Sequence, residues 1–240
     1  MMTLKSKINQ NIEKTDIGTA KSNHESDTDV AVDFTFVPKP VYSFFKRLFD
    51  FVVSSVCIIV LLVPFIVISL MILVEDRNAS PLFVQKRVGK NGKIFNIYKF
   101  RTMCADAEDK LVELQELNEA DGPVFKIKDD PRITKVGALL RSSNIDELPQ
   151  IFNIFLGNMS FVGPRPALPK EVEQYRESDK LRLLVVPGLT CYWQATENRN
   201  QVSFDEWMEL DRKYIMERNA WVDIKLIFKT FLFLFKKSGY

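Results

Sequence analysis

The feature that most constrains this chain is an uncharged, largely apolar stretch that runs from Phe51 to Val74. Its 24 residues would form a straight helix about 36 Å long at roughly 1.5 Å per residue. The hydrocarbon core of a bilayer is about 30 Å thick. Buried helices of soluble proteins rarely carry uncharged runs of this length. The stretch therefore predicts a helix in contact with a membrane.

The topology of this helix depends on its proline and its flanks. Pro64 lies near the middle, where it removes a backbone hydrogen bond and clashes with the preceding turn. Both flanks carry the basic residues typical of cytoplasmic flanks: Lys39, Lys46 and Arg47 before the stretch, and Arg77, Lys86, Arg87, Lys90 and Lys93 after it. We therefore expect residues 41–75 to form a re-entrant membrane-anchoring helix, broken near Pro64, with both ends cytoplasmic. A tilted single span also fits the length, so that alternative stays open.

The membrane stretch divides the chain into three parts. Residues 1–40 are polar and contain too few apolar side chains to drive ordering, so we expect a disordered tail. Residues 76–240 are mixed in composition and long enough to bury a core, so we expect a folded domain there.

The residue inventory limits the chemistry of this domain. The only histidine is His24 in the polar tail, and the three cysteines, Cys57, Cys104 and Cys191, form no CxxC pair. A zinc site, a disulfide framework and an imidazole base are therefore not expected. The net charge of +2 gives no indication of a nucleic-acid partner. Carboxylates, lysines, arginines and a hard cation remain for catalysis.

Local patterns predict an α+β domain that is largely helical. Two short apolar stretches around the turn signal at 89–92 predict a β-hairpin over 81–100. The remaining patterns predict three helices, over 105–120, 170–184 and 203–219. The C-terminal stretch 221–237 combines an apolar run with lysines. It fits either an amphipathic helix at a membrane surface or a helix that covers the domain core, and both alternatives stay open.

The strongest candidate for chemistry is the pair Asp146 and Glu147, which shortly precedes Pro149. Proline fits the first turn of a helix, so we expect Asp146 to be its N-cap. A helix N-terminus keeps a carboxylate ionised, and an ionised aspartate can attack phosphorus while the neighbouring glutamate holds Mg²⁺. Two purely structural interpretations stay open: Asp146 is only a cap, or Asn144 is the cap and Glu147 its capping-box partner.

Arginines near this pair are candidates for phosphate binding. Arg141 lies five residues before Asp146, within reach of the same phosphate. Arg165 stands between Pro164 and Pro166, and a stiff backbone presents a guanidinium to an anion with less loss of entropy. The alternative for Arg165 is a polyproline-II turn with a solvated side chain.

A series of motifs follows one order along the chain: KRLFD at 46–50, PLFVQKRVG at 81–89, KFRTM at 99–103, DPRIT at 130–134, DELPQ at 146–150, MSFVGPRP at 159–166 and PGLT at 187–190. Through these motifs, over about residues 45–235, the chain resembles the bacterial sugar transferase family. Its members are monotopic polyprenyl-phosphate phosphoglycosyltransferases, such as undecaprenyl-phosphate galactose or glucose phosphotransferases. They begin the assembly of capsule, exopolysaccharide and other surface glycans.

The resemblance implies an activity and its residues. Asp146 would attack the β-phosphate of a UDP-sugar, release UMP and become a phosphosugar ester. Polyprenyl phosphate would then take the sugar phosphate and give a lipid diphosphate sugar. Glu147 would be the second catalytic residue and bind Mg²⁺. The substrate-binding residues implied by the resemblance are Lys99, Arg101, Arg132, Arg141, Arg165 and Arg199.

The resemblance also implies a fold and a location. The family fold is a small, largely helical α+β domain on a re-entrant membrane helix, with amphipathic helices at the membrane interface. Residues 76–240 would then be a sugar-phosphate transferase domain on the cytoplasmic side of a bacterial inner membrane. Its partners would be a UDP-sugar, polyprenyl phosphate and the lipid bilayer. Val63 departs from the pattern, because a serine commonly precedes the helix-breaking proline in the family.

Some features stay open at this point. Cys191 and Asn198 stand where family members frequently have glycine, in a stretch that would help to choose the sugar. A hexose such as glucose or galactose is the first expectation and an N-acetylated sugar the second. The sequence permits a homo-oligomer and leaves the polyprenyl length open. Two alternatives to the activity remain, a membrane-tethered scaffold for glycan enzymes and a glycosyltransferase that releases UDP.

Overall fold

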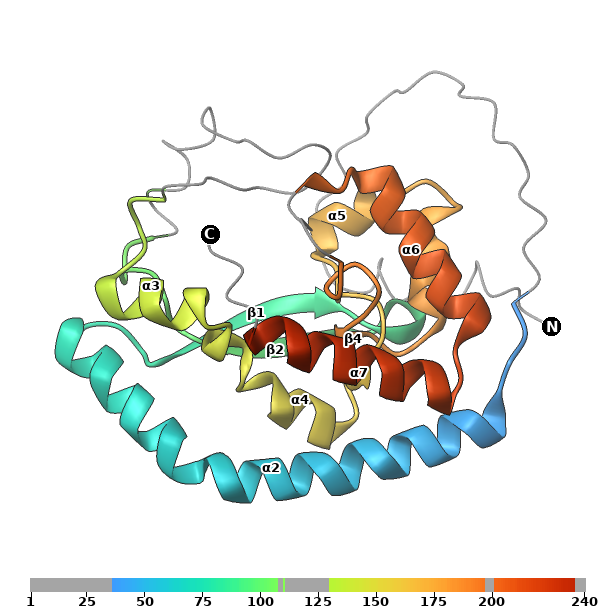
Figure 1. Ribbon diagram of the computed structural model, residues 1–240. Helices are drawn as coiled ribbons and strands as arrows, with labels where there is room; N and C mark the ends of the chain where they lie inside the picture. The colour runs from blue at the N-terminus through green and yellow to red at the C-terminus, as the bar shows by residue number, and fades with distance from the viewer. Residues whose placement is uncertain (1–35, 108–109, 111–129, 197–200, 236–240) are drawn as a thin grey trace.

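A computed structural model describes residues 36–107, 110, 130–196 and 201–235 of the 240-residue chain. Most of the predicted tail, most of the helix predicted over 105–120, and Arg199 lie outside the described residues. The described part is a largely helical α+β fold with two small two-stranded sheets. Figure 1 shows one long helix that runs beneath the rest of the domain.

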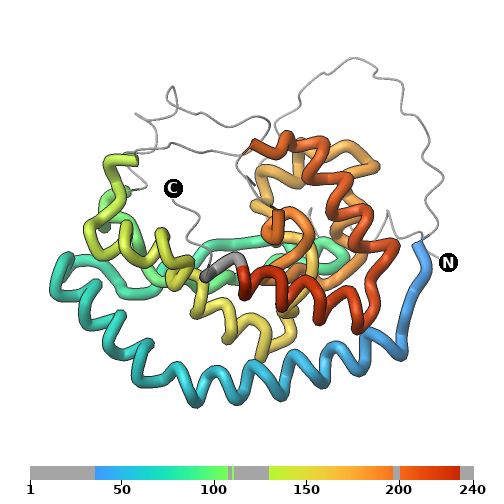
Figure 2. The backbone as a smooth tube through the Cα atoms, viewed as in Figure 1, coloured from blue at the N-terminus to red at the C-terminus, as the bar shows by residue number. Residues whose placement is uncertain are grey.

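The long helix is α2 (Pro40–Glu75), and it stays helical through Pro64. The predicted break is therefore replaced by a continuous helix, which curves along its length in Figures 1 and 2. A proline inside a helix commonly bends it without ending it when neighbouring elements hold both halves. Among the described residues, α2 is the one helix with the length and composition to cross a membrane.

Charged side chains fix α2 to two helices of the domain. Near its start, the Arg47 guanidinium donates to the carbonyl oxygens of Ile154 and Phe155, both at 2.7 Å, at the end of α4 (Gln150–Leu156). At its other end, the Glu75 carboxylate accepts from the first two backbone N–H groups of α3 (Lys135–Ser142), at 2.8 and 3.0 Å. Cations suit helix C-termini and anions suit N-termini, so both contacts are favourable. Because they lie near opposite ends, α2 runs along the domain.

The first sheet is the β-hairpin predicted over 81–100. Strands β1 (Leu82–Val88) and β2 (Ile94–Phe100) pair antiparallel, from Leu82 opposite Phe100 to Val88 opposite Ile94. The connection, η1 (Lys90–Gly92), contains Asn91 at φ 57° and Gly92 at φ 77°. Asparagine and glycine tolerate this left-handed region, which confirms the turn signal.

The second sheet joins the GPRP and PGLT motifs. Strand β3 (Ser160–Val162) runs parallel to β4 (Gly188–Thr190), and the Gly163 N–H donates to the Thr190 carbonyl at 2.9 Å. A Cβ on Gly163 or on Gly188 would collide with the backbone of the opposite segment. Both glycines are therefore required for the close approach that places the Pro-Arg-Pro turn beside the PGLT strand.

The remaining helices partly match the predictions. The helix predicted over 170–184 is two short pieces, α5 (Pro169–Glu173) and the 3₁₀ helix η5 (Asp179–Leu184). The Asp179 carboxylate accepts the Arg176 backbone N–H at 3.1 Å, a side-chain bond that competes with continuous helix. Helix α6 (Phe204–Glu217) begins at a Ser203–Glu206 capping box and confirms the helix predicted over 203–219.

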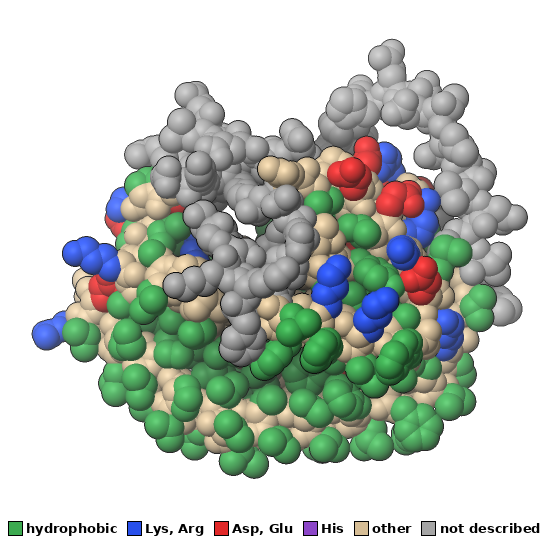
Figure 3. All heavy atoms as spheres, viewed as in Figure 1, with side chains coloured by type: hydrophobic (Ala, Val, Ile, Leu, Met, Phe, Trp, Pro, Cys, Tyr) green, Lys and Arg blue, Asp and Glu red, His purple; other side chains and the backbone are tan. Residues whose placement is uncertain are grey.

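Helix α7 (Ala220–Phe235) has two apolar sides. One side covers the core, where Leu226 is buried with Val162 and Tyr214. The other carries the exposed side chains Trp221, Ile224, Phe228, Phe231 and Leu232. Figure 3 shows hydrophobic side chains gathered on the lower part of the molecule, where α2 and α7 lie. The core-covering alternative is thus confirmed, and the exposed side remains available for the membrane-surface alternative.

Candidate active site

The turn that carries Asp146 and Glu147 lies between α3 and α4. After α3 ends, Asn144 adopts a left-handed conformation, with φ 54°, and leads into the 3₁₀ turn η4 (Ile145–Glu147). Helix α4 begins only at Gln150, with Pro149 in the N-cap position. Asp146 therefore lies within a separate short turn and is not the N-cap of a helix.

The capping-box prediction is also wrong. Asn144 occupies the N-cap position of η4, but its side chain makes no capping hydrogen bond. The left-handed residue starts a new turn, so the helix beyond Pro149 has its own beginning. A three-residue turn also has little macrodipole, so a helix N-terminus is not what determines the ionisation of Asp146.

Apolar residues on both sides of the acidic pair fix it to the long helix. Ile145 and Leu148 pack in a cluster with Phe100 of β2 and with Phe65 and Ile68 of α2. The turn that carries the two carboxylates therefore shares a hydrophobic cluster with the apolar helix. A reaction between a water-soluble substrate and a lipid would need such a position.

The two carboxylates lie among cations from two other elements. Lys99, near the end of β2, donates from Nζ to Glu147 Oε1 at 2.6 Å. Arg141, in the last turn of α3, is held by a hydrogen bond from its Nε to Thr102 Oγ1 at 2.9 Å. The charges of Lys99 and Arg141 both act on Asp146. The structure thus brings together four of the residues predicted from the sequence: Lys99, Arg141, Asp146 and Glu147.

Burial raises the pKa of the Asp146 carboxyl to about 6, and the charge of Glu147 acts in the same direction. The ammonium of Lys99 and the guanidinium of Arg141 lower this pKa but do not cancel the effect of burial. The carboxyl is therefore mostly ionised above pH 7, and it is more basic than an exposed aspartate. A raised pKa in a site with specific charge partners is a common property of catalytic groups.

Arg165 lies on the turn between β3 and α5, and that turn is held from both sides. The Gly188 N–H donates to the Pro164 carbonyl at 2.9 Å, and Arg182 Nη2 donates to the Arg165 carbonyl at 2.9 Å. The Arg165 guanidinium carbon lies 5.9 Å from the centre of the Trp193 ring. The stiff presentation predicted from the two prolines therefore has additional supports from distant parts of the chain.

Arg182 is a contributor that the sequence analysis missed. It is fully buried, forms an ion pair with Asp211 at 2.8 Å and donates to the Tyr175 hydroxyl at 2.7 Å. Its guanidinium carbon lies 4.9 Å from the ring centre of Trp207, which stacks on Trp193. These residues come from the segment between α5 and η5, from α6 and from the loop after β4, so no local sequence pattern could reveal the cluster.

Two further predicted substrate-binding residues, Arg101 and Arg132, bind groups other than the acidic pair. Arg132 is buried in a two-bond pair with Asp130, at 2.8 and 2.6 Å. Arg101 donates from Nε to the Ser80 carbonyl at 2.9 Å. Arg199 is outside the described residues. The Arg132 guanidinium thus holds the segment that carries Asp130.

The acidic pair is also where Mg²⁺ was expected. The described residues contain no group of three or more His, Cys, Asp or Glu side chains suited to a metal ion. Mg²⁺ commonly takes only one or two carboxylates and completes its shell with water and substrate phosphates. Asp146 and Glu147 fit that requirement. In this structure the Glu147 carboxylate forms an ion pair with Lys99.

Comparisons with known proteins show which family the chain resembles. The sequence profile described as "Bacterial sugar transferase" matches residues 41–237, which include the long helix, the acidic pair and the Pro-Arg-Pro turn. The match therefore covers most of the chain and every predicted site residue.

Similar proteins come from several bacteria. The galactosyl transferase CpsE of Streptococcus agalactiae is 42% identical over 77% of this chain and 41% of its own length. The undecaprenyl-phosphate galactose phosphotransferase of Salmonella typhimurium is 37% identical over 82% of this chain and 41% of its own. The exopolysaccharide production protein ExoY of Sinorhizobium fredii is 34% identical over 86% of this chain and 95% of its own.

The chain thus spans about two fifths of the length of the first two relatives and nearly all of the third. Together, the profile match, the order of the motifs and the site that they form lead to one conclusion. This chain belongs to the bacterial sugar transferase family.

Proposed function

We propose that this protein transfers a sugar 1-phosphate from a UDP-sugar to undecaprenyl or a similar polyprenyl phosphate. The observation that carries the proposal is the position of Asp146. Its carboxylate has a raised pKa, is flanked by Lys99 and Arg141, and lies on a turn packed against the apolar helix α2. One side of the site is therefore suited to phosphates, and the other is suited to a lipid.

The reaction has two displacements at the same phosphorus. In the first, a carboxylate oxygen of Asp146 forms a bond to the β-phosphorus, and the bond from that phosphorus to the bridging oxygen breaks. UMP leaves with the bridging oxygen, and a phosphosugar ester remains on Asp146. In the second, a phosphate oxygen of the polyprenyl phosphate attacks the same phosphorus and frees Asp146. The product is a polyprenyl diphosphate sugar.

The cations of the site bind and orient the phosphates. Lys99 and Arg141 lie nearest to the acidic pair and neutralise charge on the transferred phosphoryl group. Arg165 presents a guanidinium from the rigid turn to the nucleotide phosphates. Glu147, with Asp146 beside it, would hold Mg²⁺, which supplies further charge neutralisation on the phosphate oxygens when bound.

The same proposal assigns the membrane topology. Lys39 just before α2 donates to the Arg218 carbonyl at 2.8 Å, and Glu75 at the other end binds α3. A straight span would carry one end of α2 across the bilayer and break one of these contacts. We therefore infer that α2 enters and leaves the cytoplasmic membrane by one face, with the catalytic domain in the cytoplasm where UDP-sugars are made.

Product analysis with purified protein tests the chemistry. UDP-galactose or UDP-glucose with undecaprenyl phosphate and Mg²⁺ should give UMP, and EDTA should stop the reaction. Without lipid, a donor labelled in its β-phosphate should label the wild-type chain but not Asp146→Asn. Release of UDP would instead identify a simple glycosyltransferase. Equal labelling of the variant would reject Asp146 as the nucleophile, and turnover by neither protein with any UDP-sugar would favour the scaffold alternative.

A further inference from the structure

Arg87 is a buried cation that the mechanism above leaves unused. It lies in β1 and is 6% exposed. Its Nη1 donates to the Pro166 carbonyl at 3.1 Å and its Nη2 to Gln85 Oε1 at 2.7 Å, while its Nε is buried without a partner. Both acceptors are neutral, and no carboxylate of the described residues forms an ion pair with it. The carboxylates of Glu171 and Glu147 act on Arg87 as charges but form no ion pair with it. A buried guanidinium without a directly paired carboxylate is unfavourable unless an anion binds there.

A second arginine, Arg165, directly precedes Pro166, whose carbonyl accepts from Arg87. Burial lowers the pKa of Arg87 to about 10, and the charge of Arg165 is the next largest cause. Within the described chain, Arg165 has an aromatic neighbour in Trp193 but no acidic partner. Two guanidiniums that repel each other across a site, with no carboxylate bound to either, are an arrangement that a multivalent anion would stabilise.

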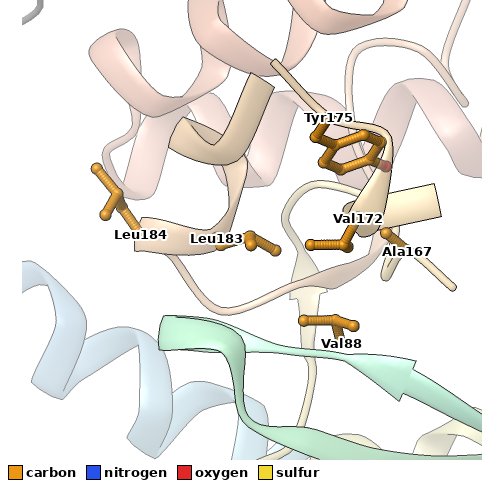
Figure 4. Packing of buried hydrophobic residues seen from close by; sticks show 6 residues of the cluster. All are labelled: Val88, Ala167, Val172, Tyr175, Leu183 and Leu184. Atoms are coloured by element: carbon orange, nitrogen blue, oxygen red, sulfur yellow. The ribbon is translucent and has the colours of Figure 1, made fainter. Parts of the chain in front are cut away.

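The backbone keeps these two residues together. The Val88 N–H donates to the Ala167 carbonyl at 2.8 Å, which joins β1 to the segment after the Pro-Arg-Pro turn. Figure 4 shows Val88 and Ala167 in one hydrophobic cluster, with Val172 and Tyr175 beside them. Arg87 and Pro166 are the preceding residues on the two segments, so their placement is set by the core.

The hairpin also aligns Arg87 with the acidic pair. Arg87 pairs with Phe95 and Phe83 pairs with Lys99, so Arg87 and Lys99 project from the same face of the two strands. Four residues of strand separate their positions, which is about 13 Å at 3.3 Å per residue. Glu147, which binds Lys99, is also among the charges that act on Arg87. A series of cations therefore runs from the acidic pair to the Arg165 turn.

We propose that Arg87 is a further substrate-binding residue, which acts with Arg165 as a paired guanidinium site for the diphosphate of the nucleotide sugar. The inference rests on the proposed function, because that function supplies the diphosphate. The diphosphate would form the direct ion pairs that both guanidiniums lack. Arg87 also keeps its bond to the Pro166 carbonyl, so binding at one guanidinium is coupled to the position of the other.

The competing explanation is that Arg87 only holds the turn in place. The two explanations differ in salt dependence and in the effect of a conservative change. A direct charge contact is weakened by added salt, and its loss removes part of the salt dependence of binding. If Arg87 only holds the turn, its replacement should leave the salt dependence of binding unchanged. Lysine at position 87 keeps the charge but cannot reproduce both guanidinium contacts.

The test is calorimetric binding of UDP to the full chain in detergent at 50 and 300 mM NaCl. Arg87→Gln should weaken UDP binding by at least about tenfold at low salt, and its affinity should change less with salt than that of the wild type. The UDP affinity of Arg87→Lys should lie between that of the wild type and that of Arg87→Gln. Arg176→Gln is the control, because Arg176 is about half exposed and already has two carboxylate partners, the buried Asp179 and the exposed Asp205. It should bind UDP as the wild type does.

Two results would overturn the proposal. One is UDP affinity in Arg87→Gln equal to that of the wild type. The other is a loss of affinity with the full salt dependence retained and no recovery in Arg87→Lys, which would mean that Arg87 only holds the turn. If Arg87→Gln melts well below the wild type, the UDP affinity of Arg87→Lys relative to the wild type decides between the two explanations. Repeating the titrations in Asp146→Asn separates this inference from the proposed function, because UDP binding there requires no covalent step.

Discussion

The ammonium of Lys99 lies 2.6 Å from a carboxylate oxygen of Glu147, and this contact connects the β-hairpin to the turn that carries Asp146. Lys99 is also one of the two cations that lower the pKa of Asp146 against the effect of burial. One side chain therefore positions the expected metal ligand, Glu147, and favours the ionised form of Asp146, the proposed nucleophile. The hairpin contributes to the chemistry of the site as well as to its fold.

Lys99→Met should reduce kcat/KM by more than about tenfold, since one charged contact to phosphate is worth roughly 1.5–3 kcal/mol. The proposed nucleophile is the ionised form of Asp146, so activity should fall as the pH drops through its pKa, which is about 6. Removing a cation that lowers this pKa should move the acidic limb of the pH profile to higher pH. The measurement is lipid-free UMP release between pH 5 and 8. An acidic limb that stays in place or moves down would contradict the assigned role.

Asp146→Asn should make the metal-free protein more stable at pH 7.5 while abolishing turnover. The folded pKa of about 6 is higher than the ordinary value of 3.8, so ionisation of Asp146 opposes folding. By proton linkage, the free-energy cost of ionising Asp146 in the folded protein is absent below its ordinary pKa. This cost grows as the pH rises and is complete above the folded pKa. It amounts to about 2–3 kcal/mol at pH 7.5. Thermal denaturation in EDTA at pH 4 and pH 7.5 measures it.

The increase in melting temperature should be a few degrees at pH 7.5 and much smaller at pH 4. Asp205→Asn is a suitable control, because Asp205 is exposed and binds only the exposed Arg176. A variant that is both inactive and more stable would show that lost turnover is not caused by unfolding. Equal melting temperatures at both pH values would mean that Asp146 is not held in an unfavourable ionised state.

The buried pair of Arg182 and Asp211 should behave as one unit. Asp211→Leu alone leaves a buried guanidinium without its counter-charge, and it should destabilise the protein by about 3–5 kcal/mol. Arg182→Met combined with Asp211→Leu should cost less than the sum of the two single changes. Urea denaturation of the four proteins gives the interaction energy. Additive effects would mean that the pair is not coupled in solution.

The elements that the sequence predicted correctly are those with local signals. The hairpin is set by the Asn91–Gly92 turn, and α6 begins at the Ser203–Glu206 box. The helix caps near Asp146 were predicted wrongly, because the left-handed Asn144 divides the segment into two turns and nothing local requires that conformation. An element was predicted correctly where its neighbouring residues alone determine the backbone conformation, and wrongly where they do not.

The residues of the candidate site also divide into those with a local sequence signal and those without one. Lys99, Arg141, Asp146 and Arg165 lie in short motifs and were identified from them. Arg182 acts through contacts across several elements, and no local sequence pattern indicates them. Arg87 was counted only as a basic flank of the membrane helix. Its position in β1, on the same face of the hairpin as Lys99, could have distinguished it once strand register was considered.

The last prediction concerns the topology of α2. A single cysteine at Ser22, in a chain whose three native cysteines are replaced by alanine, should be protected from a membrane-impermeant thiol reagent in intact cells. Permeabilised cells should label it. The reason is that Lys39 and Glu75, on the two ends of the helix, both contact the same domain. If the domain is cytoplasmic, the tail before the helix is cytoplasmic too.

A cysteine at Glu173, an exposed position on the domain, is the matched control. Both cysteines should be labelled only after permeabilisation if α2 enters and leaves by one face. A single span would instead give labelling of Ser22→Cys in intact cells and protection of Glu173→Cys, since the two positions would lie on opposite sides. That result would require the contacts of Lys39 with α6 to be absent in the membrane. The enzyme assignment would be unaffected, because it depends on Asp146 and its cations.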